Sequence, residues 1–443
     1  MAAAVVAALA APTPLAAETL AEAMASAYAN NPTLNAERAG LRAIDEGVPQ
    51  ALSGYRPTVT GSADAGVSDS STSGTTYPRG IAISVEQPLF LGHRTTNSVK
   101  AAETAVLAGR EGLKSAEQGV LLDAVNAFMD LVQAQAVLNL RRQNVEFLGE
   151  QVRAAEDRLN VGEGTRTDVA QTNARLAVGQ SELNAAAAAL NAAVAVYQQV
   201  VGHMPKSLGN GGTVDPMLPA TLEAGLAAAM AGHPAIVAGT YNIDIAAYNV
   251  KINEGALLPT VSLSGTLSHR DGLSGGGPTT SNSASLVGRL SVPIYSGGLT
   301  SAKVREAKET LGQRRLELDA ARDAVRQAVI TAWGGLDAAR AQIRAANAGV
   351  AAQQLVLDGV IEERKVGQRT TLDVLNAQQE LLNTRVAQVS AQHDRVVAAY
   401  ALLSAVGMLS AEKLGLQVAR YDPTDHYVKV RDKWGGLRTP DGR

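Results

Sequence analysis

The sequence predicts a mainly α-helical protein with a smaller β part, written as two copies of one structural plan. Three observations predict this fold class: an internal repeat with a period of 202 to 205 residues, a seven-residue apolar spacing in the long segments, and period-two alternation in the short ones. The hydrophobic fraction is 46%, but aromatic residues make up only 3%. Small apolar side chains let helices pack at close range, so this composition favours paired helices over a bulky globular core.

The repeat is visible in matched residues of the two halves. Pro32 recurs as Pro234, a shift of 202, and Asp168 recurs as Asp373, a shift of 205. We therefore expect five segments: a signal peptide over 1–17, a first repeat over 18–202, a linker over 203–220, a second repeat over 221–407 and a tail over 408–443.

Each repeat contains one very long helix that turns back on itself. The long helices are expected at about His93–Asn160 and Leu299–Lys365, and the returning helices at about Thr167–Val201 and Leu372–Val406. These form helical hairpins over 93–201 and 299–406. Apolar residues recur every seven positions: Val99, Val106, Leu113 and Val120, then Val304, Leu311, Leu318 and Val325. This spacing predicts coiled-coil packing along helices of about 100 Å.

Two β-hairpins, over 57–88 and 259–293, precede the long helices. Thr58–Ser68 and Ile81–Glu86 alternate apolar and polar residues, as does the strand that begins near Val261. Four strands cannot close a membrane barrel alone, since the smallest have about eight, so several copies would share one barrel. The alternative is the edge of a soluble sandwich. Aromatic residues lie near the strand ends, as interfacial anchors would: Tyr55, Tyr77, Phe90 and Tyr295.

The N-terminus reads as a secretory signal. Residues 2–11 are apolar, a Pro break follows, and Ala16 and Ala17 supply small residues for cleavage. The positive charge that normally precedes such a run is missing, which indicates a truncated start; an ordinary apolar helix is the alternative. No other segment offers about 18 strongly apolar residues in a row, so we expect no transmembrane helix and membrane contact through strands.

Composition excludes several classes of function. The 39 Lys and Arg against 42 Asp and Glu give a net charge of −3, without the basic excess of a nucleic-acid-binding protein. With no cysteine, disulfides, thiolate metal sites and a Cys nucleophile are excluded. The six histidines show no metal-ligand spacing and no GxSxG motif occurs, so we expect neither an enzyme nor a cofactor.

The tip of the second helical hairpin, VGQRTTLDVLNAQQEL, is unusually polar. Asp373 and Asn376 share one helix face, and in a three-fold assembly each would form a ring, in which carboxylates attract cations. Arg369 is a fixed cation able to bridge to a neighbouring helix. The alternative is structural: Thr370 or Thr371 caps the helix and Asp373 occupies its first turn. Both interpretations can hold together.

These features resemble a known family. The double repeat, the ETLAEAM start, the NNP and GHP positions and the two VG-containing tips, VGEGTRTDVAQ and VGQRTTLDVLNA, are similar to the TolC family of outer-membrane channel-tunnel proteins. The resemblance implies a homotrimer with four strands per chain in one twelve-stranded barrel in outer-membrane lipid of a Gram-negative bacterium. It also implies an α-barrel in the periplasm and a mixed equatorial region that includes the tail.

The resemblance further implies a function and partners. Family members are exit ducts for tripartite drug efflux and type I protein secretion, docked on a periplasmic adaptor and an inner-membrane RND or ABC transporter. The alternative is a secreted or surface trimeric coiled-coil adhesin or scaffold, which would not need matched hairpins in both halves. The substrate is not predicted, because the seven Met residues are scattered and give no support for a copper or silver pathway.

The resemblance assigns roles to tip residues. Asp373 matches the first pore-constricting Asp, whereas Asn376 stands where many members carry a second. Arg369 matches the arginine that latches the closed tip. Thr167 and Asp168 match its partners across the interface, and Arg364 replaces a latch tyrosine and would form a salt bridge instead. The tip turns, where the adaptor docks, are Val161, Gly162, Val366 and Gly367.

Overall fold

The computed structural model describes residues 17–442 apart from 73, 210–211, 213 and 275–276. The expected signal peptide therefore lies almost entirely outside the described residues. The chain divides into two compact units, one built from 1–35, 114–233 and 324–420 and the other from 36–113, 234–323 and 421–443. Both repeats contribute to both units, because the long helices run from one unit into the other.

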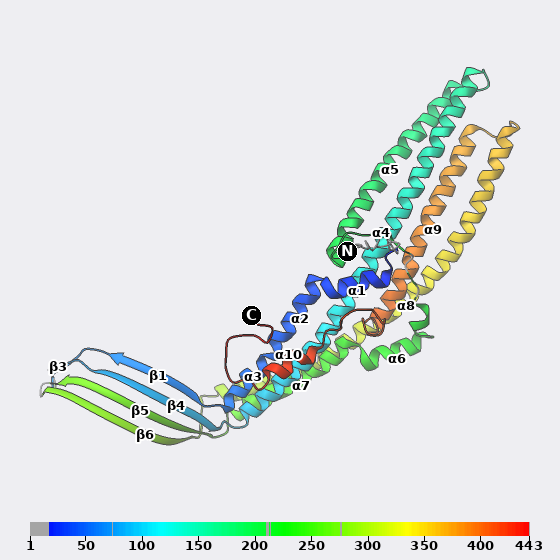
Figure 1. Ribbon diagram of the computed structural model, residues 1–443. Helices are drawn as coiled ribbons and strands as arrows, with labels where there is room; N and C mark the ends of the chain where they lie inside the picture. The colour runs from blue at the N-terminus through cyan, green and yellow to red at the C-terminus, as the bar shows by residue number, and fades with distance from the viewer. Residues whose placement is uncertain (1–16, 73, 210–211, 213, 275–276, 443) are drawn as a thin grey trace, which may run out of the picture. The chain divides into compact units, whose positions relative to one another are not determined.

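The helices and strands follow the repeat (Figure 1). The helices are α1 (Leu20–Asn30), α2 (Pro32–Asp45), α3 (Gly47–Leu52), α4 (Arg94–Asn160), α5 (Arg166–Val201), α6 (Leu222–Gly232), α7 (Pro234–Gly255), α8 (Leu299–Lys365), α9 (Thr371–Ala405) and α10 (Pro423–Val430), with 3-10 turns η1 (Ser53–Tyr55) and η2 (Asp215–Met217). The strands are β1 (Thr58–Ala65), β2 (Ser68–Ser70), β3 (Gly74–Thr76), β4 (Arg79–Phe90), β5 (Thr260–Ser274) and β6 (Gly277–Ser291).

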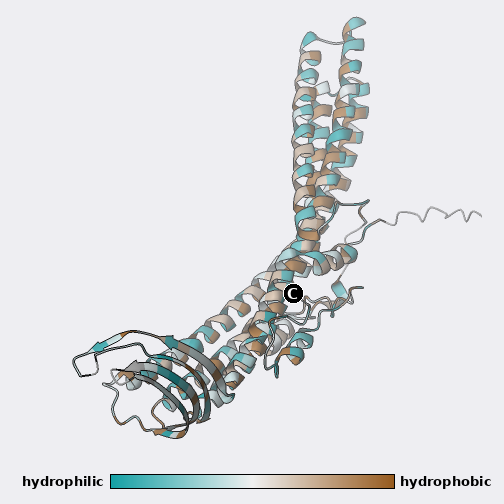
Figure 2. Cartoon of the chain, turned by 60° about the vertical axis from the view of Figure 1, so that its left-hand side comes forward, coloured by the Kyte–Doolittle hydropathy of each residue, from teal (hydrophilic) through white to brown (hydrophobic). Residues whose placement is uncertain are grey.

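The first unit is dominated by two helical hairpins. α4 turns back into α5 and α8 into α9, and the hairpins lie side by side (Figure 1). Polar and apolar residues both occur along the whole length of these helices (Figure 2). Near the second tip, Leu357 of α8 packs with Val374 and Leu381 of α9, against Phe147 of α4. The cluster holds three of the four long helices together.

The apolar positions predicted from the seven-residue spacing are largely buried. Val106, Leu113 and Val120 of α4 are 1–9% exposed, and so are Val304, Leu318 and Val325 of α8. α4 also contains an 18-residue stretch with a mean hydropathy of 1.3, long and apolar enough to cross a membrane by length and composition. A buried core helix has the same composition, and 44% of this stretch is buried inside the fold.

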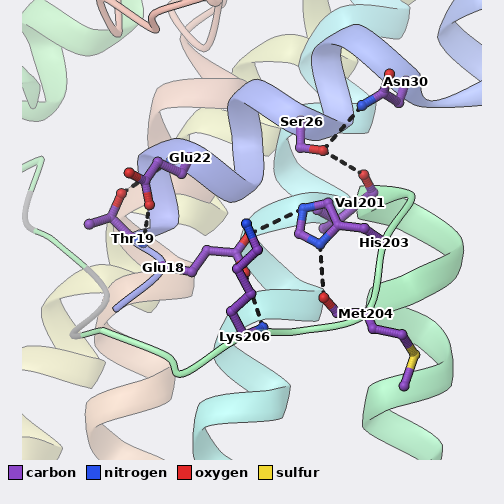
Figure 3. Close-up of polar contacts among 9 residues, drawn as sticks. All are labelled: Glu18, Thr19, Glu22, Ser26, Asn30, Val201, His203, Met204 and Lys206. Atoms are coloured by element: carbon purple, nitrogen blue, oxygen red, sulfur yellow. Dashed lines mark hydrogen bonds and ion pairs between the residues drawn. The ribbon is translucent and has the colours of Figure 1, made fainter. Parts of the chain in front are cut away.

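The segment before α1 is fixed to the segment that follows α5. Glu18 forms a parallel bridge with Leu208, and its carboxylate lies 3.2 Å from Nε2 of His203 and accepts from the amide of Lys206 at 3.3 Å (Figure 3). Thr19 then caps α1 in a capping box with Glu22. These contacts tie the start of the first repeat to the segment that follows its returning helix.

The second unit holds a curved four-stranded sheet (Figure 2). Its strands run antiparallel in the order β1-β4-β5-β6, so each repeat contributes one hairpin. The first predicted strand, Thr58–Ser68, divides into β1 and β2. The amide of Gly66 still donates to the carbonyl of Pro78 at 2.9 Å, in register with β1 and β4, but Pro78 has no amide to donate in return and the ladder ends there.

The tail from Tyr421 onward belongs to the second unit. His426 of α10 is buried and its Nδ1 lies 3.0 Å from Asp45 Oδ2, while Arg431 donates to Glu103 at 3.1 Å. Arg56 stacks on Trp434 with 4.7 Å from Cζ to the ring centre. Burial raises the pKa of Asp45 above its ordinary value, and the contact with His426 partly offsets this.

Candidate functional site at the helical tips

The second tip is a tight turn with a capped helix start. Gly367 adopts φ 79°, a left-handed conformation that favours glycine, and ends α8. Thr370 then caps α9: its hydroxyl accepts from the amide of Asp373 at 3.2 Å, and the Asp373 carboxylate accepts from the amide of Thr370 at 2.9 Å. Of the two predicted caps, Thr370 is the one observed. These hydrogen bonds hold the pKa of Asp373 below its ordinary value, so its carboxylate stays ionised.

The first tip has the same construction. Gly162 ends α4 with φ 81°, and Thr165 caps α5 in a capping box with Asp168. The Asp168 carboxylate accepts from the amide of Thr165 at 3.1 Å and from its hydroxyl at 2.7 Å. Sequence reasoning missed Thr165, although the 205-residue shift from Thr370 points directly to it.

The two arginines of the second tip have different surroundings. Arg369 Nε donates to Glu363 Oε2 at 2.8 Å, and this partner raises the pKa of Arg369. Arg364 donates from Nη1 to Gln151 Oε1 on α4 at 3.0 Å, and its Nε is buried without a hydrogen bond. Burial lowers the pKa of Arg364, and the charge of Arg158 adds to this effect.

The predicted latch residues do not meet within one chain. In the described part of the chain, no hydrogen bond or ion pair joins Arg369 or Arg364 to Thr167 or Asp168. Thr167 is exposed in the first turn of α5, and Asp168 serves its cap. A latch among these residues would therefore have to form between copies.

Asn376 has a partner that the sequence did not reveal. Arg175 of α5 donates from Nη2 to Asn376 Oδ1 at 3.0 Å, across 201 positions of sequence. Glu363 and Gln151, the partners of the two tip arginines, were missed as well. The predicted pore position Asn376 thus lies against a cation from the other hairpin.

The sheet presents one apolar and one polar face. Register places four apolar or small residues in one row and four hydroxyl residues in the next: Val59, Val85, Gly265 and Leu286, then Thr60, Ser84, Thr266 and Ser285. The apolar side chains are open to the surroundings, with Leu286 74% and Leu267 63% exposed. In the described residues, the outer edges of β1 and β6 have no partner strand. A face this apolar, between two open edges, marks an interaction surface.

Comparison with known proteins places these features in context. The family model for outer membrane efflux proteins matches the chain twice, over residues 23–203 and 226–408. The outer membrane efflux protein BepC of Brucella suis is 50% identical over 428 residues, covering 96% of this chain and 93% of BepC. The alkaline protease secretion protein AprF of Pseudomonas aeruginosa is 27% identical, covering 79% of this chain and 74% of AprF.

A solved structure shares the fold. The CmeC outer membrane channel of Campylobacter jejuni superposes with a TM-score of 0.79 at 17% identity, covering 93% of this chain and 89% of that one. The combination of two helical hairpins and two β-hairpins in each chain is therefore a fold already known among outer membrane channels.

Proposed function

The chain belongs to the outer membrane efflux protein family, and we propose that three copies form one exit duct, gated at the helical tips. The resemblance to TolC-type outer-membrane channels is confirmed, and the protein is placed in the outer membrane with its helices in the periplasm. The family is one of channels rather than of enzymes. Family membership favours the channel over the adhesin or scaffold.

The strongest support for the proposed three-copy duct comes from the sheet. An apolar face that is open to the surroundings suits lipid, and the polar face beside it suits a water-filled lumen. Four strands with open edges on β1 and β6 cannot close a barrel, but edge-to-edge pairing of three copies gives twelve strands and leaves no edge. The helical hairpins of three copies would then continue the duct through the periplasm.

The cargo is proposed from the relatives. BepC, at 50% identity, is named an efflux protein, which favours export of small molecules such as drugs. AprF, at 27%, is named for protease secretion, which supports type I protein secretion as a second candidate. Deleting the gene and restoring it from a plasmid separates the two: efflux predicts a change in drug susceptibility, and secretion a protein missing from the culture medium.

The gate would lie at the second tip. Three Asp373 carboxylates would form a pore ring beside the Asn376 positions, and like charges at a narrow axis repel, so a latch must hold the closed state. Arg369 and Arg364 would reach Thr167 and Asp168 of the neighbouring copy. Because Arg369 already pairs with Glu363 in its own chain, opening would exchange one partner for the other.

The tip turns would dock the adaptor. Val161 and Val366 are each 71% exposed at the very ends of the hairpins, beside the positive-φ residues Gly162 and Gly367. Two matched apolar side chains per copy give two sets of three contact points, six in all, for a periplasmic adaptor. The adaptor would in turn connect to an inner-membrane transporter of the RND or ABC class.

Cross-linking of strand edges tests the assembly. The chain has no cysteine, so a Thr60→Cys change on β1 can be combined with one cysteine on the same face of β6, at Ser281, Ser283 or Ser285. In outer membranes under mild oxidation, at least one pair should give covalent dimers and a closed covalent trimer. Gel mobility before and after reduction measures the products.

The matched control places the second cysteine inside the sheet. Thr60→Cys with Ser264→Cys also places both cysteines on the polar face of the sheet. β6, however, lies between Ser264 and the next copy. This pair should stay monomeric under denaturing conditions. Monomers from all three edge pairs, or a ladder beyond the trimer, would contradict the closed three-fold barrel.

A further inference from the structure

The contact between Arg175 and Asn376 leaves a positive charge at the tip. Arg175 is half-buried on α5, and its guanidinium donates to a neutral amide rather than to a carboxylate. In the described residues no acidic side chain lies within ion-pair distance of Arg175. Arg141 shows the contrast, since its guanidinium lies 2.6 Å from the Glu182 carboxylate. The charge of Arg175 is therefore oriented by its partner but not neutralised.

Asn376, the partner of Arg175, lies close to Asp373 on α9. Asn376 lies three residues after Asp373, on the same face of α9 and about 4.5 Å further along the axis. The Asp373 carboxylate is ionised and held by Thr370, so both charges are fixed in place. One chain thus presents a negative group and, about one helical turn from it, a positive one.

We propose that Arg175 is a selectivity-determining residue that makes the constriction bipolar, with an acidic ring at Asp373 and a basic ring held on Asn376. The proposal rests on the proposed function, in which Asp373 and Asn376 line a three-fold pore. Three guanidiniums bind oxyanions through paired N–H donors, so the basic ring takes carboxylate or phosphate groups. The duct would then pass molecules with an anionic group and lose much of the cation preference that acidic rings alone would give.

Asparagine is required for this role. A carboxylate introduced by Asn376→Asp would form a salt bridge with Arg175 and cancel its charge, whereas the Asn376 amide positions the guanidinium through one hydrogen bond. Asn376 stands where many family members carry a second acidic residue. Through its contact with Arg175 it therefore holds a positive charge at this position instead of a negative one.

Ion selectivity in planar bilayers tests the proposal. Purified trimers in a KCl gradient give the ratio of K⁺ to Cl⁻ permeability from the reversal potential. Arg175→Gln removes the basic ring and should raise this ratio at least about twofold. Asn376→Asp should raise it as well by neutralising Arg175, and the double variant Arg175→Gln/Asn376→Asp should raise it most.

Matched variants separate charge from folding. Arg175→Lys keeps the charge and should keep the wild-type ratio. Arg153→Gln removes the same net charge from an exposed site on α4 and should leave the ratio unchanged. Inorganic pyrophosphate on the periplasmic side should block wild-type channels more strongly than Arg175→Gln channels, because the oxyanion site is lost.

Two results would overturn the proposal. An unchanged ratio in Arg175→Gln channels that conduct and run as trimers would show that Arg175 does not reach the ion path, while the proposed duct would stand. An equal shift with Arg153→Gln would show a diffuse effect of net charge. Wild-type trimers that do not conduct would instead contradict the proposed function, because there would be no pore. This failure is seen without any variant.

Discussion

The two helical tips are built on the same backbone but differ in charge. Residues 205 positions apart repeat the turn glycine, the threonine cap and the capping carboxylate: Gly162 and Gly367, Thr165 and Thr370, Asp168 and Asp373. Both caps form the same reciprocal hydrogen bonds. Since every hairpin needs a stopped helix and a capped return, the shared residues serve folding in both tips, and what sets the tips apart must lie in the residues around them.

Two residues that differ give the second tip an ion pair. Arg369 stands where the first tip has Gly164, and its partner Glu363 stands where the first tip has Arg158. Gly164 cannot easily gain a side chain, because a Cβ there would lie 3.0 Å from the amide nitrogen of Leu159. The first tip is thus a close-packed turn, and the second carries an ion pair beside an ionised Asp373. Under the proposed function, the second tip supplies the pore ring and the latch cation, and the first tip supplies the latch partners Thr167 and Asp168.

The difference between the tips is tested most directly at the capping carboxylates. Asp373→Ala should lower the K⁺ to Cl⁻ permeability ratio about fivefold and weaken block by a trivalent cation, because the only acidic ring proposed for the constriction is lost. Asp168→Ala removes the equivalent cap and a proposed latch partner from the first tip, so it should raise conductance as an opened latch would, but it should leave the ratio near the wild-type value. Reversal potentials in a KCl gradient measure both, and equal shifts in the two variants would mean that the tips do not differ in function.

A smaller effect is expected at the latch. Arg369→Ser removes the charge that pairs with Glu363 and that would bridge to the next copy, so closed tips should separate and single-channel conductance should rise about twofold. Arg166→Ser in the first turn of α5 is the matched change in the other tip and should leave conductance near the wild-type value. Identical conductance and gating in Arg369→Ser and wild type would show that Arg369 is not part of the latch.

The periodic parts of the fold could be predicted because local patterns determine them. The seven-residue spacing predicted the buried side of α4 and α8, and alternation with the internal repeat predicted four strands, which the structure joins in one sheet. Breaks within helices and strands were harder to predict. Two helices, α2 and α3, divide around Glu46. Such breaks depend on packing against other elements, which sequence periodicity does not encode.

The contacts between the hairpins could not be predicted. Arg175 and Asn376 are 201 positions apart, and Asp45 and His426 are 381 apart. No repeat or spacing relates these pairs, because each is brought together only when separate helices pack. The caps differ in this respect, since Thr370 and Asp373 lie within one turn, and the cap was foreseen in the second tip. The hydrogen-bonded cap could therefore be predicted from the sequence, whereas the positive charge that tertiary packing brings to Asn376 could not.

The smallest effect is expected where the tips are alike. Thr165→Ala and Thr370→Ala each remove a threonine cap that accepts from the amide three residues on, and each should cost about 1 kcal/mol of local stability. Hydrogen exchange of the first-turn amides of α5 and α9 should quicken about fivefold in the respective variant, and by the same factor in both. Selectivity should stay the same in Thr165→Ala. If exchange quickened only in Thr370→Ala, the caps would not be equivalent. The conclusion that the shared residues serve folding in both tips would then be wrong.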